Sequence, residues 1–168
     1  MKFDRIILIK NSCNQITIVV SYGYKNHQPK LIRSQTMNQI VIRYQNGRLM
    51  KGVTNDFLPA KDRFHLIPLD SAPNSKPLEV VVADLKAIFF VKDFDGNAKY
   101  KEVKQFDPSK PVPGRKIRVV FKDGEVMVGI TQGYQPERPG FFVLPADGQS
   151  NNERCFVVAS AAREVTFL

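Results

Sequence analysis

The sequence is poor in the residues that usually carry chemistry. It has two cysteines, Cys13 and Cys155, which cannot form a framework of several disulfides, so we expect two free thiols buried as small apolar side chains. Its two histidines, His27 and His65, have no cysteine or carboxylate at metal-ligand spacing around them. We therefore expect no metal site and no cofactor, and a structural role for His65.

Catalytic motifs are also missing. The chain has no Gly-x-Ser-x-Gly segment of the kind that presents a serine nucleophile. Gly47 and Gly52 have the spacing of a phosphate-binding loop, but the residues that follow include no lysine at the required place. Asp93 and Asp95 lack the further oxygen ligands and the closing glutamate of a calcium loop. The sequence therefore predicts a protein that is not an enzyme.

Long hydrophobic runs are absent too. No stretch approaches the roughly 18 uninterrupted apolar residues that a membrane span requires. The first ten residues are too short and too charged for a signal peptide, so we expect a cytoplasmic protein with no membrane partner. Because Met37 stands just before the region with a repeat, we also consider it a candidate translation start, with residues 1–36 as an upstream extension.

The net charge is +9, and its distribution along the chain shows whether it indicates a nucleic-acid-binding surface. Residues 1–38 carry +5 and residues 92–116 carry +3, whereas residues 39–91 carry +2 and residues 117–168 carry −1. The excess lies in the leader and in a linker. This favours basic connecting segments on the surface over a dedicated nucleic-acid groove.

The most informative feature is an internal repeat. Residues 40–91 align without a gap on residues 117–168, and 13 of the 52 aligned residues are identical. Self-similarity of this kind indicates a duplicated folding unit. We therefore divide the chain into an N-terminal extension (1–38), a first barrel (39–91), a charged linker (92–116) and a second barrel (117–168).

Each repeat reads as five short strands. Ile40–Tyr44 alternates in polarity, and Asn46-Gly47 predicts a two-residue type I′ hairpin, as does Asp123-Gly124 in the second copy. Gly52 stands in the middle of the return strand, where a bend or a close backbone approach is the usual reason. The remaining strands are predicted at 64–68, 78–83 and 88–91 and at 141–145, 155–159 and 165–168, with short 3₁₀ turns at 84–87 and 160–163.

Five short strands without a covering helix are typical of a small closed barrel. We therefore predict an all-β protein of two duplicated five-stranded barrels related by a pseudo-twofold axis. Ahead of them, residues 5–10 and 15–22 predict two further strands, which form either an added hairpin or a loosely ordered arm.

The linker contains the best candidate for a phosphate-binding strip. It gathers lysines and an arginine around two aromatic residues, Tyr100 and Phe106, which would stack on bases. The alternative is a solvated charged linker whose aromatic residues lie on the barrels. The candidate contacts are Lys99, Tyr100, Lys101, Lys104, Lys110, Arg115 and Lys116.

The repeats resemble known families at their hairpins. Each is similar to an Sm-like barrel, or more broadly to an SH3-like barrel, in its Asn/Asp-Gly turn, its mid-strand glycine and the aromatic residue after it, here Asn46-Gly47, Gly52 and Phe57. The second copy has Asp123-Gly124, Gly129 and Tyr134. The two-lobed arrangement also resembles an uncharacterised bacterial family found alone or beside PilZ domains, which brings no established activity.

The resemblance does not carry RNA binding with it. Sm proteins read RNA with an Asp-x-x-x-Asn segment after the second strand and an Arg-Gly pair before the fifth, and neither is present here. We therefore predict a non-catalytic small-barrel binding or adaptor protein of unknown ligand that engages a protein partner by edge pairing or groove contact. The alternative is RNA binding through the basic linker and leader, and self-association into a homo-oligomer is left open.

Overall fold

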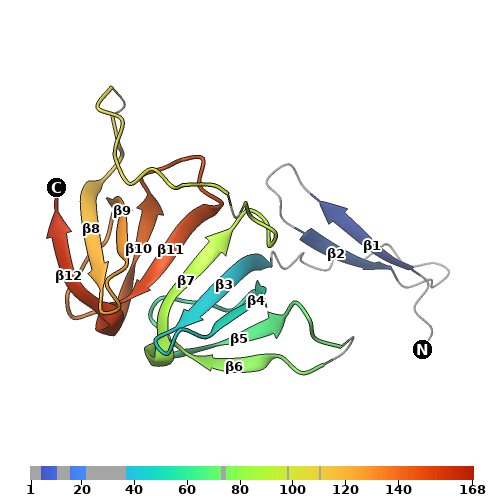
Figure 1. Cartoon of the computed structure of the whole chain (residues 1–168). Helices are drawn as coiled ribbons and strands as arrows, with labels where there is room; N and C mark the ends of the chain where they lie inside the picture. Colours follow the sequence, from blue (N-terminus) through green and yellow to red (C-terminus); the bar gives the residue numbers. More distant parts are fainter. Residues whose placement is uncertain (1–4, 11–15, 22–36, 73–74, 98, 110) are drawn as a thin grey trace. The chain divides into compact units, whose positions relative to one another are not determined.

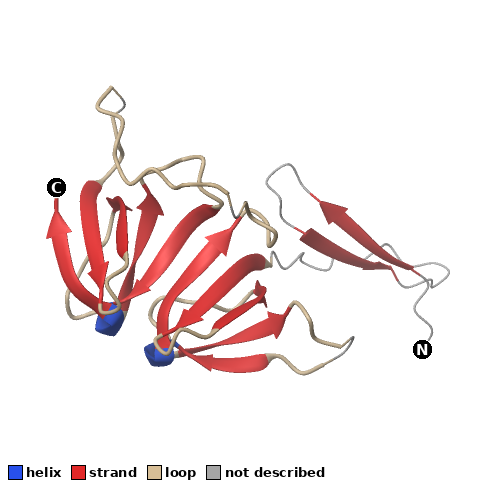
Figure 2. Ribbon diagram, viewed as in Figure 1, coloured by secondary structure: helices blue, strands red, loops and turns tan. Residues whose placement is uncertain are grey.

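The computed structural model of the chain describes residues 5–10, 16–21, 37–72, 75–97, 99–109 and 111–168. The chain divides into two units, Met1–Asn38 and Gln39–Leu168. Strands dominate the described residues, and the only helices among them are two short 3₁₀ turns (Figures 1 and 2). This confirms the all-β prediction. No helix of the described part of the chain is long and apolar enough to cross a membrane.

The first unit contains a hairpin. Strands β1 (Arg5–Lys10) and β2 (Ile16–Ser21) pair antiparallel, with Arg5 opposite Ser21 and Lys10 opposite Ile16. The two strands predicted from the β-branched runs are confirmed at these positions. Residues 11–15, which include Cys13, and residues 22–36, which include His27, lie outside the described residues.

The second unit is built on ten strands and two 3₁₀ turns, η1 and η2. The turns begin one or two residues earlier than predicted and link the fourth strand of each repeat to the fifth (Figure 2). The elements are β3 (Asn38–Tyr44), β4 (Leu49–Thr54), β5 (Arg63–Pro68), β6 (Leu78–Val81), η1 (Val82–Asp84), β7 (Leu85–Val91), β8 (Arg115–Phe121), β9 (Val126–Thr131), β10 (Gly140–Pro145), β11 (Asn152–Val158), η2 (Ala159–Ala161) and β12 (Ala162–Phe167).

These ten strands form a single sheet in the order β12-β8-β9-β10-β11-β7-β3-β4-β5-β6 (Figure 1). Within each repeat the order is the same: the fifth strand, then the first, second, third and fourth. The repeats meet where β7, the fifth strand of the first repeat, pairs antiparallel with β11, the fourth strand of the second. The sheet is therefore continuous across the two repeats.

This topology corrects two predictions. The repeats do not close as barrels, because the sheet is open, with β12 and β6 as its outer strands. Closing the first repeat would require β6 to pair with β7, but the two edges of β7 are taken by β3 and β11. The predicted pseudo-twofold axis is also wrong, because a twofold would pair like strands, whereas here a fifth strand meets a fourth.

The predicted hairpins are present, with a longer loop than expected. Tyr44 pairs with Arg48 through a backbone hydrogen bond of 2.8 Å, and the N–H of Gly47 donates to the Tyr44 carbonyl at 3.0 Å. Three residues therefore lie in the loop rather than two, and Gly47 supplies a left-handed conformation, with φ of +86°. The second copy repeats this geometry at Gly124, with φ of +87°.

The mid-strand glycines are explained by the close backbone approach that the sequence predicts. A Cβ on Gly52 would lie 2.3 Å from the carbonyl oxygen of Ile67, and one on Gly129 would lie 2.2 Å from that of Leu144. In each repeat this is where the second strand pairs antiparallel with the third. Only glycine fits there, and the sheet packs on a core of apolar side chains from both repeats.

The linker runs mainly exposed along the second unit and joins β7 to β8. Its last two residues, Arg115 and Lys116, already belong to β8. The buried thiol of Cys155 lies in β11 without a disulfide partner, as expected.

Candidate functional site

The linker strip predicted from the sequence is largely engaged with the protein itself. The hydroxyl of Tyr100 donates to the Asp147 carboxylate at 2.5 Å, which raises the pKa of Tyr100 and lowers that of Asp147. The ammonium of Lys104 donates to the carbonyl of Val126 at 2.7 Å. These contacts fix the linker on the second repeat and occupy the polar end of its exposed tyrosine.

Two further cations of the strip lie on aromatic rings. The guanidinium of Arg115 is 3.5 Å from the ring centre of Phe167, and the ammonium of Lys116 is 5.0 Å from that of Phe106. Lys99 and Lys101 are exposed, and Lys110 lies outside the described residues. Phe106 therefore already carries a cation on its ring, and nucleic-acid binding by these residues stays a prediction.

A cluster of charges holds the two repeats together at the β7–β11 joint. Lys86 in β7 is 3% exposed, and its ammonium forms ion pairs with Asp123 and Glu125 from the hairpin of the second repeat. Arg43 in β3 also pairs with Glu125, at 2.6 Å. The hydrogen bond from Lys86 lowers the pKa of Asp123. The ring of Phe121 lies 4.5 Å from the same ammonium.

Beside this cluster the joint is aromatic. The ring of Phe57, from the loop after β4, lies 5.1 Å from Phe156 and 6.4 Å from Phe142 in the second repeat, and 5.8 Å from Phe90 in its own. The guanidinium of Arg154 covers two of these rings, at 4.3 Å from Phe90 and 5.0 Å from Phe142. Rings from both repeats thus pack into one cluster, each offering an edge or a tilted face to its neighbour.

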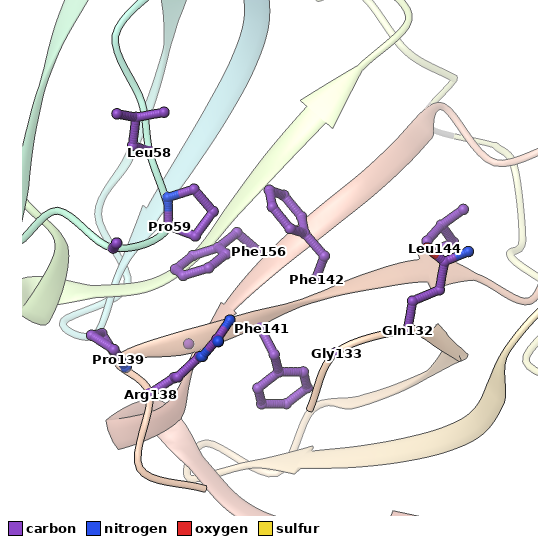
Figure 3. Close-up of a pocket in the computed structure, with 12 residues that line it drawn as sticks. Leu58, Pro59, Gln132, Gly133, Arg138, Pro139, Phe141, Phe142, Leu144 and Phe156 are labelled. Carbon is purple, nitrogen blue, oxygen red and sulfur yellow. The ribbon is translucent and has the colours of Figure 1, made fainter. Parts of the chain in front are cut away.

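A groove of about 760 Å³ opens above this cluster, between the loop of the first repeat and the third strand of the second (Figure 3). Leu58 and Pro59 form one wall, Phe142 and Phe156 line the middle, and Leu144 lies toward one end (Figure 3). Leu58 is 52% exposed and Leu144 is 41% exposed. The groove therefore offers accessible apolar surface in a concave shape, which is the usual form of a binding site.

The groove holds no group for acid–base or nucleophilic work. Of the residues that line it, Arg138 is the only one with a charge, and within the described part of the chain no hydrogen bond or ion pair involves its guanidinium. Among the described residues no cluster of histidine, cysteine and carboxylate side chains has the geometry to hold a metal ion.

The histidine expected to be structural has a partner. The ring Nδ1 of His65 lies 2.7 Å from Asp56, whose carboxylate also accepts the backbone N–H of His65 at 3.0 Å. Burial by itself would raise the pKa of Asp56, but these hydrogen bonds, with one from Thr54, outweigh it and lower the pKa. The pair ties the loop that carries Phe57 to β5.

Sequence reasoning missed both the joint and the groove, although the repeat alignment contains a signal for them. His65 and Glu79 of the first repeat align with Phe142 and Phe156 of the second. Polar residues in one copy that align with aromatic residues in the other indicate a face that is exposed in one repeat and covered in the other. The structure places both phenylalanines at the joint.

Comparison with known proteins gives a family but no activity. Residues 36–168 match the model of a family of unknown function (DUF6982). No curated protein and no solved structure matches the chain.

Proposed function

Because the chain belongs to DUF6982, a family of unknown function, we propose a function for it from its geometry: a non-catalytic binding module that takes an extended segment of a protein partner into the groove between the repeats. The observation that carries the proposal is the groove itself, with apolar walls and a single cation. The cytoplasmic location expected from the sequence is part of this proposal.

We interpret the repeats as two Sm-like or SH3-like units that have opened and joined edge to edge, because each has the same strand order and the same glycines in the hairpin and in the second strand. Small β-sheet domains of this kind commonly bind peptides in grooves or at strand edges. The resemblance supports a binding role and names no ligand.

The lining of the groove defines the partner. Leu58, Leu144 and Phe142 would bury apolar side chains of an extended segment, at roughly 1.5–3 kcal/mol for each large side chain fully removed from water. Arg138 would pair with a carboxylate of the same segment, because a guanidinium binds a carboxylate through two parallel hydrogen bonds. We therefore propose a segment with alternating apolar side chains and at least one acidic residue.

Selection of peptides from a displayed random library on the full chain, followed by titration of a selected peptide, tests this proposal. We expect Leu144→Asp and Leu58→Asp each to weaken binding about tenfold or more, the equivalent of about 1.4 kcal/mol. The matched control is Leu69→Asp, which places the same charge on an equally exposed leucine (54% exposed) that does not line the groove. If the control weakens binding as much as Leu144→Asp does, the proposal is wrong.

Charge reversal separates the groove from the linker strip. We expect Arg138→Glu to weaken binding of acidic peptides, whereas Lys101→Glu, in the strip, leaves it unchanged. Binding of mixed RNA by the same chain would instead support the RNA alternative if two conditions hold. Lys101→Glu must abolish the binding, and the binding constant must fall by about 0.7–0.9 log units per log unit of salt for each phosphate contact.

A further inference from the structure

The outer strand β12 reproduces half of the joint between the repeats. A shift of 77 residues carries Phe57 and Phe90, the first-repeat rings of the joint, onto Tyr134 and Phe167. Tyr134 and Phe167 lie 5.6 Å apart and pack edge to face. Phe90 is covered by the second repeat and is 3% exposed, whereas Phe167 is 36% exposed. Aromatic surface that is buried at the joint is thus partly open to solvent at β12, where Arg115 covers one face of Phe167.

Within the described sheet, the backbone of β12 also has an unpaired edge, the one that faces away from β8. One of its edges pairs with β8, and in the described sheet it is the outermost strand. The equivalent strand β7 uses the corresponding edge to pair with β11. An outer strand with unpaired N–H and C=O groups is a template for a further strand, and the joint shows how such a strand would lie.

A second copy of the chain does not fit this edge in the geometry of the joint. The second copy would place its β6 and β5 where the joint has β11 and β10. Glu79 would then take the position of Phe156, and His65 that of Phe142. Glu79 already forms an ion pair of 2.7 Å with Arg63. At the position of Arg154 the copy has Pro77, which has no N–H to donate to a ladder.

The charges exclude a second copy as well. Arg163 of β12 takes the position of Lys86, which at the joint meets two carboxylates of the neighbouring hairpin. On a second copy the hairpin would place Asn46 and Arg48 there instead. Two arginines would then face each other at a contact that is largely removed from water, and like charges are costly in such a place.

We propose that the β12 edge binds a different protein, through an edge strand that carries aromatic side chains beside a hairpin with carboxylates, and that it rejects a second copy of this chain. The aromatic side chains would pack on Tyr134 and Phe167 as the second repeat packs on Phe57 and Phe90. The carboxylates would pair with Arg163. None of Tyr134, Arg163 and Phe167 lines the groove, so each of the two sites can be tested by its own variants.

The test converts the chain's own opposite edge into such a partner. A variant of the full chain would carry at the β6 edge the residues found at the joint: Asn46→Asp, Arg48→Glu, His65→Phe, Pro77→Arg and Glu79→Phe. By light scattering after size exclusion, we expect the wild type to be monomeric and the variant to associate with increasing concentration. Adding Arg163→Glu reverses the association, whereas adding Arg138→Glu, a matched charge reversal in the groove, leaves it intact.

Two outcomes overturn the proposal: a wild type that associates and is dispersed by Arg163→Glu, or a variant that keeps its circular dichroism yet stays monomeric. If the variant does not fold, peptides decide the question on the unchanged protein. Titrated with the groove already saturated by a selected peptide, a peptide copying 151–159, with Cys155→Ser, is expected to bind wild type and to bind Arg163→Glu equally, since it lacks the hairpin. Under the same condition a peptide copying 75–83 is expected not to bind. The proposal is contradicted if the two peptides bind equally well, or if neither of them binds.

Discussion

The charge cluster at the joint predicts an asymmetry between its two sides. The side chain of Lys86 is 4% exposed, whereas those of Asp123 and Glu125 are 55% and 40% exposed. Removing the carboxylates leaves a buried ammonium without a partner. Removing the lysine leaves two carboxylates that water can solvate, one of which keeps its pair with Arg43. The cost of breaking the cluster therefore depends on which side is removed.

The magnitudes follow from burial. An uncompensated buried charge costs about 3–5 kcal/mol, so we expect Asp123→Asn with Glu125→Gln to lower the free energy of unfolding by about 3 kcal/mol or more. Replacing a buried ion by an apolar side chain of similar volume is close to neutral, so we expect Lys86→Met to lie within about 1 kcal/mol of wild type. In a protein of this size about 3 kcal/mol corresponds to about 6–12 °C in Tm.

Urea unfolding at pH 7, followed by circular dichroism, measures both variants. Arg63→Gln, which breaks an exposed ion pair with Glu79, is the control and should cost less than about 1 kcal/mol. Because the folded pKa of Asp123 is lowered from 3.8, its contribution is present above pH 3.8 and is lost as the pH falls through the lowered value. A Lys86→Met variant as unstable as the double carboxylate variant would show that burial of the ammonium does not set the cost of breaking the cluster.

Three other predictions concern the first repeat and the thiol. Gly52→Ala puts a Cβ 2.3 Å from a backbone oxygen and should lower the free energy of unfolding by about 1–3 kcal/mol, whereas Gly133→Ala, in open space, should be near neutral by the same urea titration. Asp56→Asn should have a lower free energy of unfolding than wild type at pH 7. This difference in free energy should shrink below pH 3.8, because the folded pKa of Asp56 is lowered. A difference that grows at low pH would contradict this. In a Cys13→Ser background, Cys155 should react with a thiol reagent only after unfolding, since burial raises its pKa, and rapid labelling of the native protein would oppose it.

Much of the local structure could be predicted because it depends on neighbours in the sequence. Alternating apolar residues gave the strands of both repeats, and Gly47 gave the turn, since its positive φ is a property of the loop alone. The loop length was wrong because Asn-Gly fits more than one hairpin type, and the three-residue loop is set by the pairing of Tyr44 with Arg48.

The pairing of the repeats could not be predicted in this way. Residues 87–91 are apolar at every position, and this suits equally a strand that closes its own barrel and one that joins a second repeat. What decides is the partner: Phe142 and Phe156 replace polar residues of the first copy, and Lys86 finds carboxylates where the first copy has Asn46 and Arg48. These differences between copies, rather than their identities, contain the information about the joint and the groove.

We propose that the groove between the repeats is where this protein binds its partner. Amide hydrogen exchange of the full chain, with and without a selected peptide at saturating concentration, tests it most directly. We predict that protection increases at residues 57–60 and 132–144, on the two walls of the groove, and that residues 99–109 exchange as before. Protection confined to 99–109, with the groove unchanged, would contradict the account.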